Sequence, residues 1–512
     1  MTTNGSNPSG GVGERLLSMF WRKPADTLAE RARRRISLHL IPFLFFLYIL
    51  AYLDRVNVSV AELAMRGPPS AGGLGFDTRI IGFGFSIFFW GYWILEIPST
   101  VSVARWGARW VFARILVLWG LCAALVGAIG TPFATHLFAW LPHVPEGAAA
   151  ISGVAHFING LRDTPKYQFY FFRFLLGFFE GGFFPSVIVY LSHWFRAQDR
   201  AKAIASFMAA IPLSSMLGMP ASGLLLGVHW YGLAGWRWIF ILEGIAPIFA
   251  GFATLFFLPD RPAKAAWLPA DEREWLMAEL GREHQGQHGH GHWLHWVRVP
   301  QLCLVVVLLT VVYFCLNVTS YGLATFMPAI IKSQSGVSNE AASYLAALPY
   351  LMGLVGMLIN GWHSDRTGER FWHAAVPLAL LGLGIGLAAA LNGLSVLPML
   401  VLILVVGTVL FAHLPAFWPV PSMFLGATAA ASAIGFINMI GNLGGSVGPR
   451  IVGEAAATTA QPDFVTGLVR IAPWPLVAAV IFLVIGYTRH KVLARPAAAE
   501  REPAPLPPVA SA

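Results

Sequence analysis

The stretch IPFLFFLYILAYLDRVNVSV, residues 41–60, places an acid and a base side by side within a long apolar run. A helix of about 20 apolar residues crosses the hydrocarbon core of a bilayer. A charged side chain at the centre of such a helix costs about 2.5–3.5 kcal/mol on insertion scales. The stretch therefore predicts a membrane-spanning helix in which Asp54 and Arg55 are compensated by pairing, by a wet cavity, or by both.

The composition extends this prediction to the whole chain. Of the 512 residues, 56% are hydrophobic and 12% are charged, whereas an ordinary globular protein is about 25% charged. The mean hydropathy is +0.64. Because so few charges cannot cover a water-soluble domain, we predict an all-α integral membrane protein.

The charge and the cysteines exclude several other classes of protein. The net charge of +9 does not indicate nucleic acid, because the basic residues lie in short breaks between apolar runs, a pattern typical of membrane topology. The three cysteines all lie in apolar segments and have neither disulfide nor metal-site spacing. No nucleophile, metal or phosphate-binding motif stands out, so we expect no enzyme activity, no cofactor and no metal.

Twelve apolar segments are long enough to span the bilayer. They lie near 36–60, 79–103, 110–130, 166–195, 202–227, 236–258, 300–330, 341–362, 372–393, 396–418, 429–453 and 468–488. We therefore predict two six-helix bundles, 36–258 and 299–490, joined by a cytoplasmic central loop, 259–298. A basic cytoplasmic segment, 1–35, precedes them, and the Pro/Ala-rich tail 491–512 is expected to be disordered. Most Lys and Arg residues fall on the side of both termini, which the positive-inside rule makes cytoplasmic.

An Arg-x-Gly-x-Arg motif occurs twice, about half a chain apart. The segment VSVARWGARW, 101–110, precedes the third predicted span of the first half, and GWHSDRTGER, 361–370, occupies the same place in the second half. The motif residues are Arg105, Gly107, Arg109, Arg366, Gly368 and Arg370. Two parallel six-helix repeats are typical of transporters whose site lies between the halves near the membrane centre. The loops are read as a cytoplasmic gating motif, with simple basic turns as the alternative.

The second copy extends to Gly-x-x-x-Asp-Arg-x-Gly-x-Arg through Gly361 and Asp365, and it resembles the loop signature of the major facilitator superfamily. The resemblance implies a fold of 12 transmembrane helices in two pseudo-symmetric bundles. The first copy departs from the pattern, because Ala104 stands in place of the acid. In that superfamily the acid helps to hold cytoplasmic helix ends together, so the first-half lock is expected to be weaker or to use another partner.

A narrower resemblance covers most of the chain. The blocks are YLDRVNVSVA, GYWILEIPS, RWGARWVFARILVLWG, RFLLGFFEGGFFPSVIVYLSHWF, GLAGWRWIFILEGI, FLPDRPAKAAWLPADER and INMIGNLGGSVGP. In this order they are similar to the anion:cation symporter family, especially its bacterial tartrate-, phthalate- and sugar-acid-type members. The resemblance implies proton-coupled movement of an organic carboxylate across the bacterial inner membrane.

Four ionisable residues stand within predicted spans 1 and 4, namely Asp54, Arg55, Arg173 and Glu180. In the predicted topology Asp54 and Arg173 both lie in the outer parts of their spans, so these two side chains can meet at similar depth. Arg173 and Glu180 are seven residues apart, so they share one helix face at a separation of about 10 Å. The neighbours Asp54 and Arg55 point roughly 100° apart and cannot both face one target.

With all four groups ionised, this cluster is neutral. A proton on Asp54 or Glu180 frees an arginine, and an incoming carboxylate then restores neutrality. Proton and anion would strengthen each other's binding by the same factor. We therefore predict proton coupling for Asp54 and Glu180 and substrate binding for Arg55 and Arg173, roles that the family resemblance also implies. The alternative is a buried ion-pair network that fixes helix packing.

Other polar residues in the predicted spans have weaker signals. Candidates for substrate contact are Tyr52, Tyr92, Tyr321 and Asn442, with Asn317 one helical turn from Tyr321; packing is an equal alternative for each. The small-residue pairs Gly177/Gly181 and Gly444/Gly448 predict close helix contacts. Structural roles are expected for Glu96 and Glu243, with Arg237 as a pairing candidate for Glu243. The His-rich segment 284–295 fits no closed zinc site and is expected to be a solvated loop.

These observations together predict a secondary active transporter. It would import an organic carboxylate (a dicarboxylate, sugar acid or aromatic acid) by proton symport with alternating access. The alternative is a drug or metabolite efflux antiporter driven by protons, which would favour acids without paired arginines. The expected partners are a small organic anion and the lipid bilayer, and we expect a functional monomer.

Overall fold

A computed structural model describes residues 27–144, 152–287, 295–394, 397–425, 427–457 and 462–493. Within these ranges all regular structure is helical. The predictions made for residues 1–26, for the centre of the His-rich loop (288–294) and for the tail 494–512 fall outside the described residues.

The first half contains six membrane-length units. They are α2 (Leu28–Met65), α3 (Thr78–Trp106), α4 (Ala108–Val126), the pair α7 (Pro165–Glu180) and α8 (Phe183–Ser192), the pair α9 (Ala197–Met208) and α10 (Ala210–Leu226), and α11 (Gly235–Phe257). Two short helices, α5 (Pro132–Phe138) and α6 (Ser152–Asp163), lie between α4 and α7 and were not predicted.

The second half repeats the plan, with more interruptions. Its units are α14 (Pro300–Ser335), α15 (Asn339–Ala346) with α16 (Leu348–Thr367), α17 (Phe371–Ala390), the run α18 (Leu397–Leu400) to α21 (Val420–Phe424), α22 (Ala427–Gly441) with α23 (Gly444–Ala456), and α24 (Phe464–Ile471) with α25 (Pro473–Leu493). The run α18 to α21 also holds a π-helical segment, Val401–Val406, α19 (Gly407–Val409) and α20 (Leu414–Phe417).

Eleven of these units are long and apolar enough by themselves to cross a membrane, counting only the described residues. The twelfth is the α22–α23 pair, which is interrupted at Asn442–Leu443. The prediction of twelve transmembrane helices in two bundles is therefore confirmed, although several spans are built from two helices.

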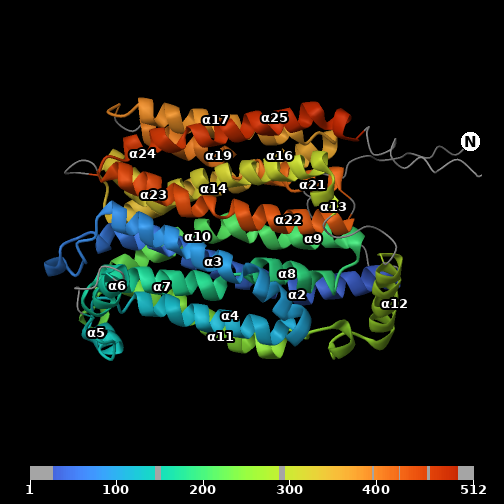
Figure 1. Cartoon of the computed structure of the whole chain (residues 1–512), viewed down its shortest axis with the longest axis horizontal. Helices are drawn as coiled ribbons and strands as arrows, with labels where there is room; N and C mark the ends of the chain where they lie inside the picture. The colour runs from blue at the N-terminus through green and yellow to red at the C-terminus, as the bar shows by residue number, and fades with distance from the viewer. Residues whose placement is uncertain are drawn as a thin grey trace, which may run out of the picture.

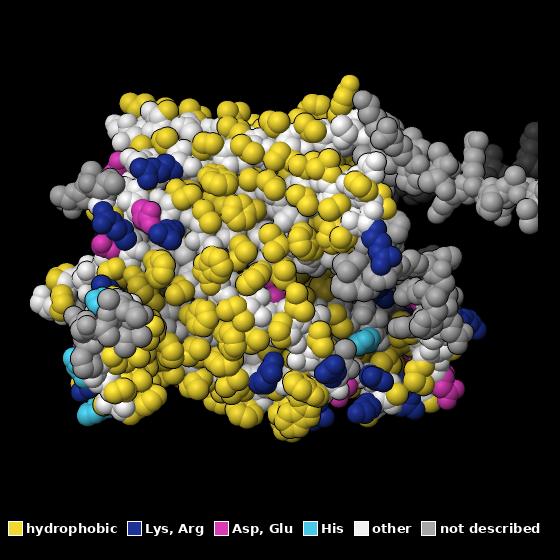
Figure 2. All heavy atoms as spheres, in the orientation of Figure 1, with side chains coloured by type: hydrophobic (Ala, Val, Ile, Leu, Met, Phe, Trp, Pro, Cys, Tyr) yellow, Lys and Arg dark blue, Asp and Glu magenta, His cyan; other side chains and the backbone are white. Residues whose placement is uncertain are grey.

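The two halves lie side by side along the length of the molecule (Figure 1). We call the end that holds the start of α2 and the linker helix α12 (Ala270–Gln287) the basic end. The end near α5, α6 and α24 is the opposite end. Large apolar side chains such as Phe249, Phe256 and Leu383 are exposed along the sides. Figure 2 shows apolar atoms over most of the long face and Lys and Arg mainly towards the ends, as expected of a surface in contact with lipid.

The linker helix α12 is fixed to the first half. Arg35 Nε of α2 lies 3.1 Å from Glu272 Oε2, and Glu272 is buried. Leu276 and Leu280 of the same helix are also buried. The polar segment between the halves, predicted as a cytoplasmic loop, is therefore partly a helix docked on the first half.

The halves meet closely at the opposite end. Thr78 Oγ1 of α3 donates to the carbonyl oxygen of Gly453 in α23 at 2.8 Å. A Cβ added at Gly82 would lie 2.5 Å from the Pro449 carbonyl oxygen. The main chains of α3 and α23 therefore touch directly, and we call this contact the glycine seam.

Close helix contacts also form where the small-residue pairs predicted them. A Cβ at Gly177 would collide with the Phe88 carbonyl group, and one at Gly448 would collide with that of Val318. The first contact brings α7 against α3, and the second brings α23 against α14. Glu180, which follows Gly177 by three residues, is thereby held against α3.

Candidate functional site

Arg55 and Glu180 form an ion pair inside the first half. Arg55 Nε donates to Glu180 Oε1 at 2.9 Å, and Nη2 donates to the same oxygen. Both side chains are buried, while Glu180 Oε2 has no partner among the described residues. The predicted meeting of spans 1 and 4 therefore takes the form of one arginine fork on one carboxylate oxygen, leaving the second oxygen free to take a proton.

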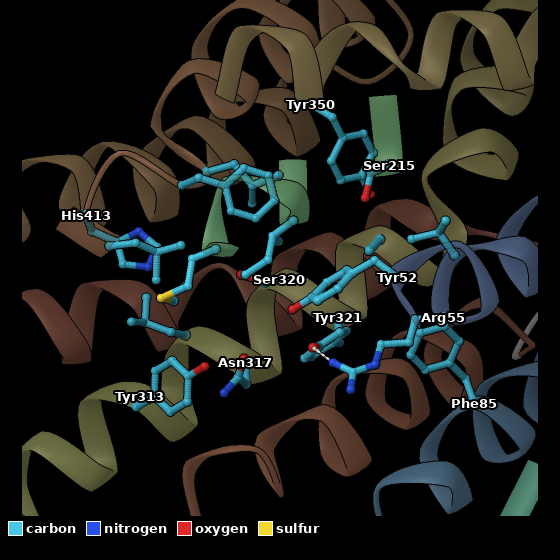
Figure 3. A pocket seen from close by; sticks show the side chains of 18 residues that line it. Tyr52, Arg55, Phe85, Ser215, Tyr313, Asn317, Ser320, Tyr321, Tyr350 and His413 are labelled. Atoms are coloured by element: carbon cyan, nitrogen blue, oxygen red, sulfur yellow. Dashed lines mark hydrogen bonds between the residues drawn. The ribbon is translucent and has the colours of Figure 1, made fainter. Parts of the chain in front are cut away.

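Arg55 also lies on the wall of a central cavity with about 800 Å³ of space not filled by atoms (Figure 3). It is the one Lys or Arg among the described residues that line this cavity. The other polar lining residues are Tyr52, Ser215, Tyr313, Asn317, Ser320, Tyr321, Tyr350 and His413. The cavity is thus bounded by both halves and carries its fixed positive charge on one side.

Aromatic rings and a tyrosine hydroxyl surround the Arg55 guanidinium. Its Cζ lies 4.9 Å from the centre of the Tyr52 ring and 5.2 Å from that of Tyr92. Its Nη1 donates to the Tyr321 hydroxyl of the second half at 3.4 Å. Ring faces attract cations without neutralising them. The rings therefore leave the charge of Arg55 to be balanced by Glu180 or by an anion that takes its place.

Arg173 does not reach the cavity, although it was predicted to bind the substrate carboxylate there. It is fully buried and does not line the cavity. Its Nη1 donates to the Asp54 carbonyl oxygen at 3.3 Å, and its Nε donates to the Gly84 carbonyl oxygen at 3.4 Å. Nη2 has no partner among the described residues. The structure therefore places a charged guanidinium behind the cavity wall, with one donor unused, and substrate binding by Arg173 stays a prediction.

Asp54 points away from Arg55, as their neighbouring positions on α2 predict. Trp119 Nε1 of α4 donates to Asp54 Oδ2, and Asn57 Nδ2 donates to Asp54 Oδ1 at 3.1 Å. Both acceptor oxygens are thus used by neutral donors, and Asp54 has no arginine within ion-pair distance in the described part of the chain. Proton coupling through Asp54 stays a prediction. The Asp54 carboxyl group lies inside the first bundle, between α2 and α4.

The weaker candidates divide into three groups. Tyr52 and Tyr321 line the cavity, as does Asn317. Tyr92 is buried beside Arg55 without lining the cavity. Asn442 does not line the cavity but contacts a residue that does, since Asn317 Nδ2 lies 3.5 Å from Asn442 Oδ1. Asn317 Nδ2 also donates to the Gly441 carbonyl oxygen at 3.1 Å.

His413, Tyr350 and Tyr313 are cavity residues that sequence reasoning missed. His413 Nδ1 and the Tyr350 hydroxyl are buried atoms with no partner among the described residues. In Figure 3 His413 lies at the other end of the pocket from Arg55. A histidine within FAHLPAFW, residues 411–418, was a visible signal, but no motif indicated which way it faced.

The two further acids in apolar runs have specific partners. Asn438 Nδ2 of α22 donates to Glu96 Oε1 of α3 at 2.7 Å, and both side chains are buried. Ser222 of α10 donates to Glu243 Oε1 at 2.7 Å. The suggested pairing of Glu243 with Arg237 is wrong, because Arg237 Nη1 instead donates to the carbonyl oxygens of Gly127 and Ile129.

The two Arg-x-Gly-x-Arg loops use their acids differently. In the second copy Arg370 Nη1 lies 2.6 Å from Asp365 Oδ1. In the first copy, which lacks this acid, Asp260 Oδ1 accepts from the Arg109 backbone N–H at 3.1 Å. Asp260 follows α11, so the first loop has an acidic partner from a distant part of the chain. Gly107 and Gly368 both have positive φ, at +87° and +68°, which explains glycine at the centre of each motif.

The remaining motif residues surround these contacts. Arg105 is exposed at the end of α3, Arg366 lies 5.5 Å from the Trp362 ring, and Gly361 packs near Pro415. The described residues contain no group of three or more His, Cys, Asp or Glu side chains that could hold a metal ion. A gating role for these loops stays a prediction.

Comparison with known proteins places this arrangement in a family. A sequence model of the Major Facilitator Superfamily matches residues 44–449. A protein of Agrobacterium vitis named "Putative tartrate transporter" is 38% identical over 482 residues, which cover 94% of this chain and 97% of that protein. The "Quinolone resistance transporter" of Acinetobacter baumannii is 33% identical over 82% of this chain and 87% of its own length.

Solved structures agree on the fold. The inward open conformation of the xylose transporter XylE from E. coli gives a TM-score of 0.63 at 13% identity, covering 88% of this chain and 96% of that one. A bacterial homolog of the human lysosomal transporter Spinster gives 0.63 at 15% identity, covering 92% and 99%. At these identities the likeness concerns the arrangement of helices alone.

Proposed function

The chain belongs to the major facilitator superfamily of membrane transporters, and we propose that it imports an organic carboxylate by proton symport across the bacterial inner membrane. The observation that carries the proposal is Arg55, a buried arginine on the cavity wall whose carboxylate partner Glu180 keeps one oxygen free. The relatives named for tartrate transport support an organic acid as the substrate.

The Arg55–Glu180 pair supplies a coupling mechanism. While Glu180 is ionised, it neutralises Arg55, and an anion entering the cavity would be left without a counter-charge. A proton on Glu180 Oε2 removes that neutralisation, and the arginine fork then accepts a substrate carboxylate through two hydrogen bonds. Each ligand therefore favours the other, and the two move together.

The rest of the cavity favours a hydroxylated acid. Beyond Arg55, its polar lining consists of tyrosine and serine hydroxyls, one asparagine and one histidine. Such groups exchange hydrogen bonds with substrate hydroxyls, but they offer no second fixed cation. A carboxylate bound at Arg55 with hydroxyl groups reaching towards His413 uses this lining more fully than an unsubstituted aromatic acid does.

Alternating access is assigned to relative rocking of the two halves. We assign the basic end to the cytoplasm by the positive-inside rule. The glycine seam then closes the cavity on the outer side, and α3 must part from α23 when the cavity opens outwards. Both termini lie on the cytoplasmic side in this orientation, and the protein is proposed to work as a monomer.

Uptake into proteoliposomes tests the proposal. Purified protein is reconstituted, and radiolabelled tartrate, gluconate and benzoate are offered with an acidic exterior. We expect accumulation of a hydroxylated acid that collapses when a protonophore removes the pH gradient. Accumulation of none of these acids, or accumulation that a protonophore leaves unchanged, would contradict proton-coupled carboxylate import.

Efflux by proton antiport is the second candidate, because a relative named for quinolone resistance is 33% identical to this chain. The buried arginine argues against it, since a cavity for apolar or cationic drugs gains nothing from a fixed positive charge. Counterflow separates the two functions. Preloaded vesicles that exchange a labelled cationic drug without a carboxyl group, such as ethidium, and that do not exchange carboxylates would favour efflux.

A further inference from the structure

Glu243 is a membrane-embedded acid for which the Arg55–Glu180 mechanism has no use. It lies on α11, facing α10 and α2 within the first half. Ser222 donates to its Oε1 at 2.7 Å, and its side chain also interacts with that of Asn57. Glu243 Oε2 is inaccessible to solvent and has no partner among the described residues.

Asn57 connects Glu243 to Asp54. The Asn57 side chain is fully buried, and its Nδ2 donates to Asp54 Oδ1 at 3.1 Å. Its Oδ1 has no donor among the described residues. One neutral amide therefore lies between two carboxyl groups, and two buried acceptors, Glu243 Oε2 and Asn57 Oδ1, have no hydrogen to accept.

The nearby cations are engaged elsewhere. Arg55 is paired with Glu180, and Arg173 and Arg237 donate to backbone carbonyl oxygens. No Lys or Arg of the described chain lies within 4.0 Å of either carboxyl group. The charged groups that act on Asp54 are Glu243, Glu180 and Arg173. Two ionised carboxylates would thus stand together without a partner cation, an arrangement in which one group ordinarily keeps a proton.

We propose that Asp54 and Glu243 form an acid pair, bridged by Asn57, that holds one shared proton in the unliganded protein. The proton gives the buried acceptors the donor that they lack, and it leaves one negative charge instead of two. The buried cluster of Asp54, Glu180, Glu243, Arg55 and Arg173 is then neutral with this proton bound. The pair is a proton site separate from Glu180, on the far side of α2 from the cavity.

The shared proton is independent of the proposed function, whereas its use in transport rests on proton symport. Infrared spectroscopy of the unliganded full-length protein at neutral pH tests the first point. A protonated carboxyl group has a C=O band that an ionised one lacks, and the band shifts in D₂O. We expect a band in the wild type that is missing from the Asp54→Asn/Glu243→Gln double variant. A double variant that retains the full wild-type band overturns the proposal.

A matched control is Glu454→Gln, which replaces an exposed acid paired with Arg450 at the opposite end. It should retain the band and the wild-type melting temperature. If the double variant does not fold, the infrared band and the melting temperature of the single variant Glu243→Gln test the shared proton. As an isosteric mimic of the protonated acid, it should retain the wild-type melting temperature while the band weakens, and an unchanged band overturns the proposal.

The transport role has its own readout. We expect Glu243→Gln to shift the pH profile of uptake relative to wild type, with Glu454→Gln unchanged. A profile identical to wild type would show that the pair holds its proton throughout the cycle and would overturn the coupling role. If the carboxyl band is present in wild type and lost in the double variant, but uptake does not depend on pH, the acid pair is supported and the proposed proton symport is contradicted.

Discussion

Asn438 Nδ2 lies 2.7 Å from Glu96 Oε1, and this hydrogen bond joins the two halves of the protein. Glu96 is one helical turn from Tyr92, on the side of the basic end. We expect Asn438→Leu to loosen the halves at the basic end, because it removes the donor and leaves a buried carboxyl group without a partner. Spin labels placed across the halves at that end should report longer distances. Glu96→Gln keeps an acceptor oxygen and serves as the control, with distances expected to match wild type. Equal distances in all three proteins would show that this hydrogen bond does not hold the halves together.

Loss of Arg55 should destabilise the protein as well as abolish carboxylate binding. Arg55→Ala leaves Glu180 buried without its cation, and breaking a buried pair in this way costs about 3–5 kcal/mol. The melting temperature of purified Arg55→Ala should therefore fall. The double variant Arg55→Ala/Glu180→Gln should recover stability but not binding. If the double variant binds carboxylates, Arg55 is not the anchor.

Glu180→Gln should separate exchange from accumulation. Glutamine cannot take the proton, and it leaves Arg55 without a competing anion, so the cavity stays ready for a carboxylate. We expect counterflow exchange at rates near wild type, while uptake driven by a pH gradient is lost. Vesicles that still concentrate the substrate against its gradient would remove Glu180 from the coupling mechanism.

His413 should contribute to selection among carboxylates. Its side chain lines the cavity at the other end from Arg55, and a hydrogen bond to a substrate hydroxyl is worth about 0.5–1.5 kcal/mol. His413→Phe should therefore weaken binding of a hydroxylated acid by that amount and leave its deoxy analogue unaffected. Calorimetric titration of both acids measures the difference. Equal losses for the two acids would indicate a packing role.

Glu369 should stabilise the second Arg-x-Gly-x-Arg loop above acidic pH. Burial acts to raise the pKa of this carboxyl group, but hydrogen bonds from the Trp372 and His373 backbone N–H groups and from the His373 ring hold its pKa below the ordinary value of 4.5. Its contribution is thus complete above the ordinary value and is lost as the pH falls through the lower folded-state pKa. Glu369 precedes Arg370, the N-cap of α17, and each hydrogen bond that it accepts from the first turn of this helix contributes about 0.5–1.5 kcal/mol.

The measurement for this loop is thermal unfolding of wild type and Glu369→Gln at several pH values. The difference between them should be largest near neutral pH and should shrink in acid. Glu340→Gln, at the opposite end of the same span, provides a control with no comparable cap contact to the 368–372 segment. A difference that grows as the pH falls would contradict this account.

Much of the architecture was readable from the sequence because the bilayer allows few solutions. Apolar length gave the spans, and the paired loops gave the two halves. The sequence predicted that spans 1 and 4 meet through their ionisable residues, with Asp54 and Arg173 at one depth, whereas the ion pair that forms is Arg55 with Glu180. The sequence could not show that Arg173 donates to backbone carbonyl oxygens instead of a carboxylate. Every residue has a carbonyl oxygen, so residue types do not indicate which of them accepts a hydrogen bond.

Contacts made by residues distant in the chain were equally hidden. Asp260 fills the place of the acid missing from the first loop, although nothing near Ala104 indicates it. Asn57 and Glu243 meet because α2 and α11 pack side by side; the sequence indicated a structural role for Glu243 and drew no attention to Asn57. The short helices α5 and α6 fell in a weakly apolar stretch where neither length nor periodicity predicted structure.

The glycine seam has a mechanical consequence. Where Gly82 meets α23 and Gly453 meets α3, the two main chains are in direct contact, and no side chain lies between them. At these two glycines no side chain stands between the helices, so parting them here breaks main-chain contacts and the hydrogen bond from Thr78 to Gly453. In the proposed orientation this contact closes the cavity on the outer side, and the charge state of the buried cluster then decides when it opens.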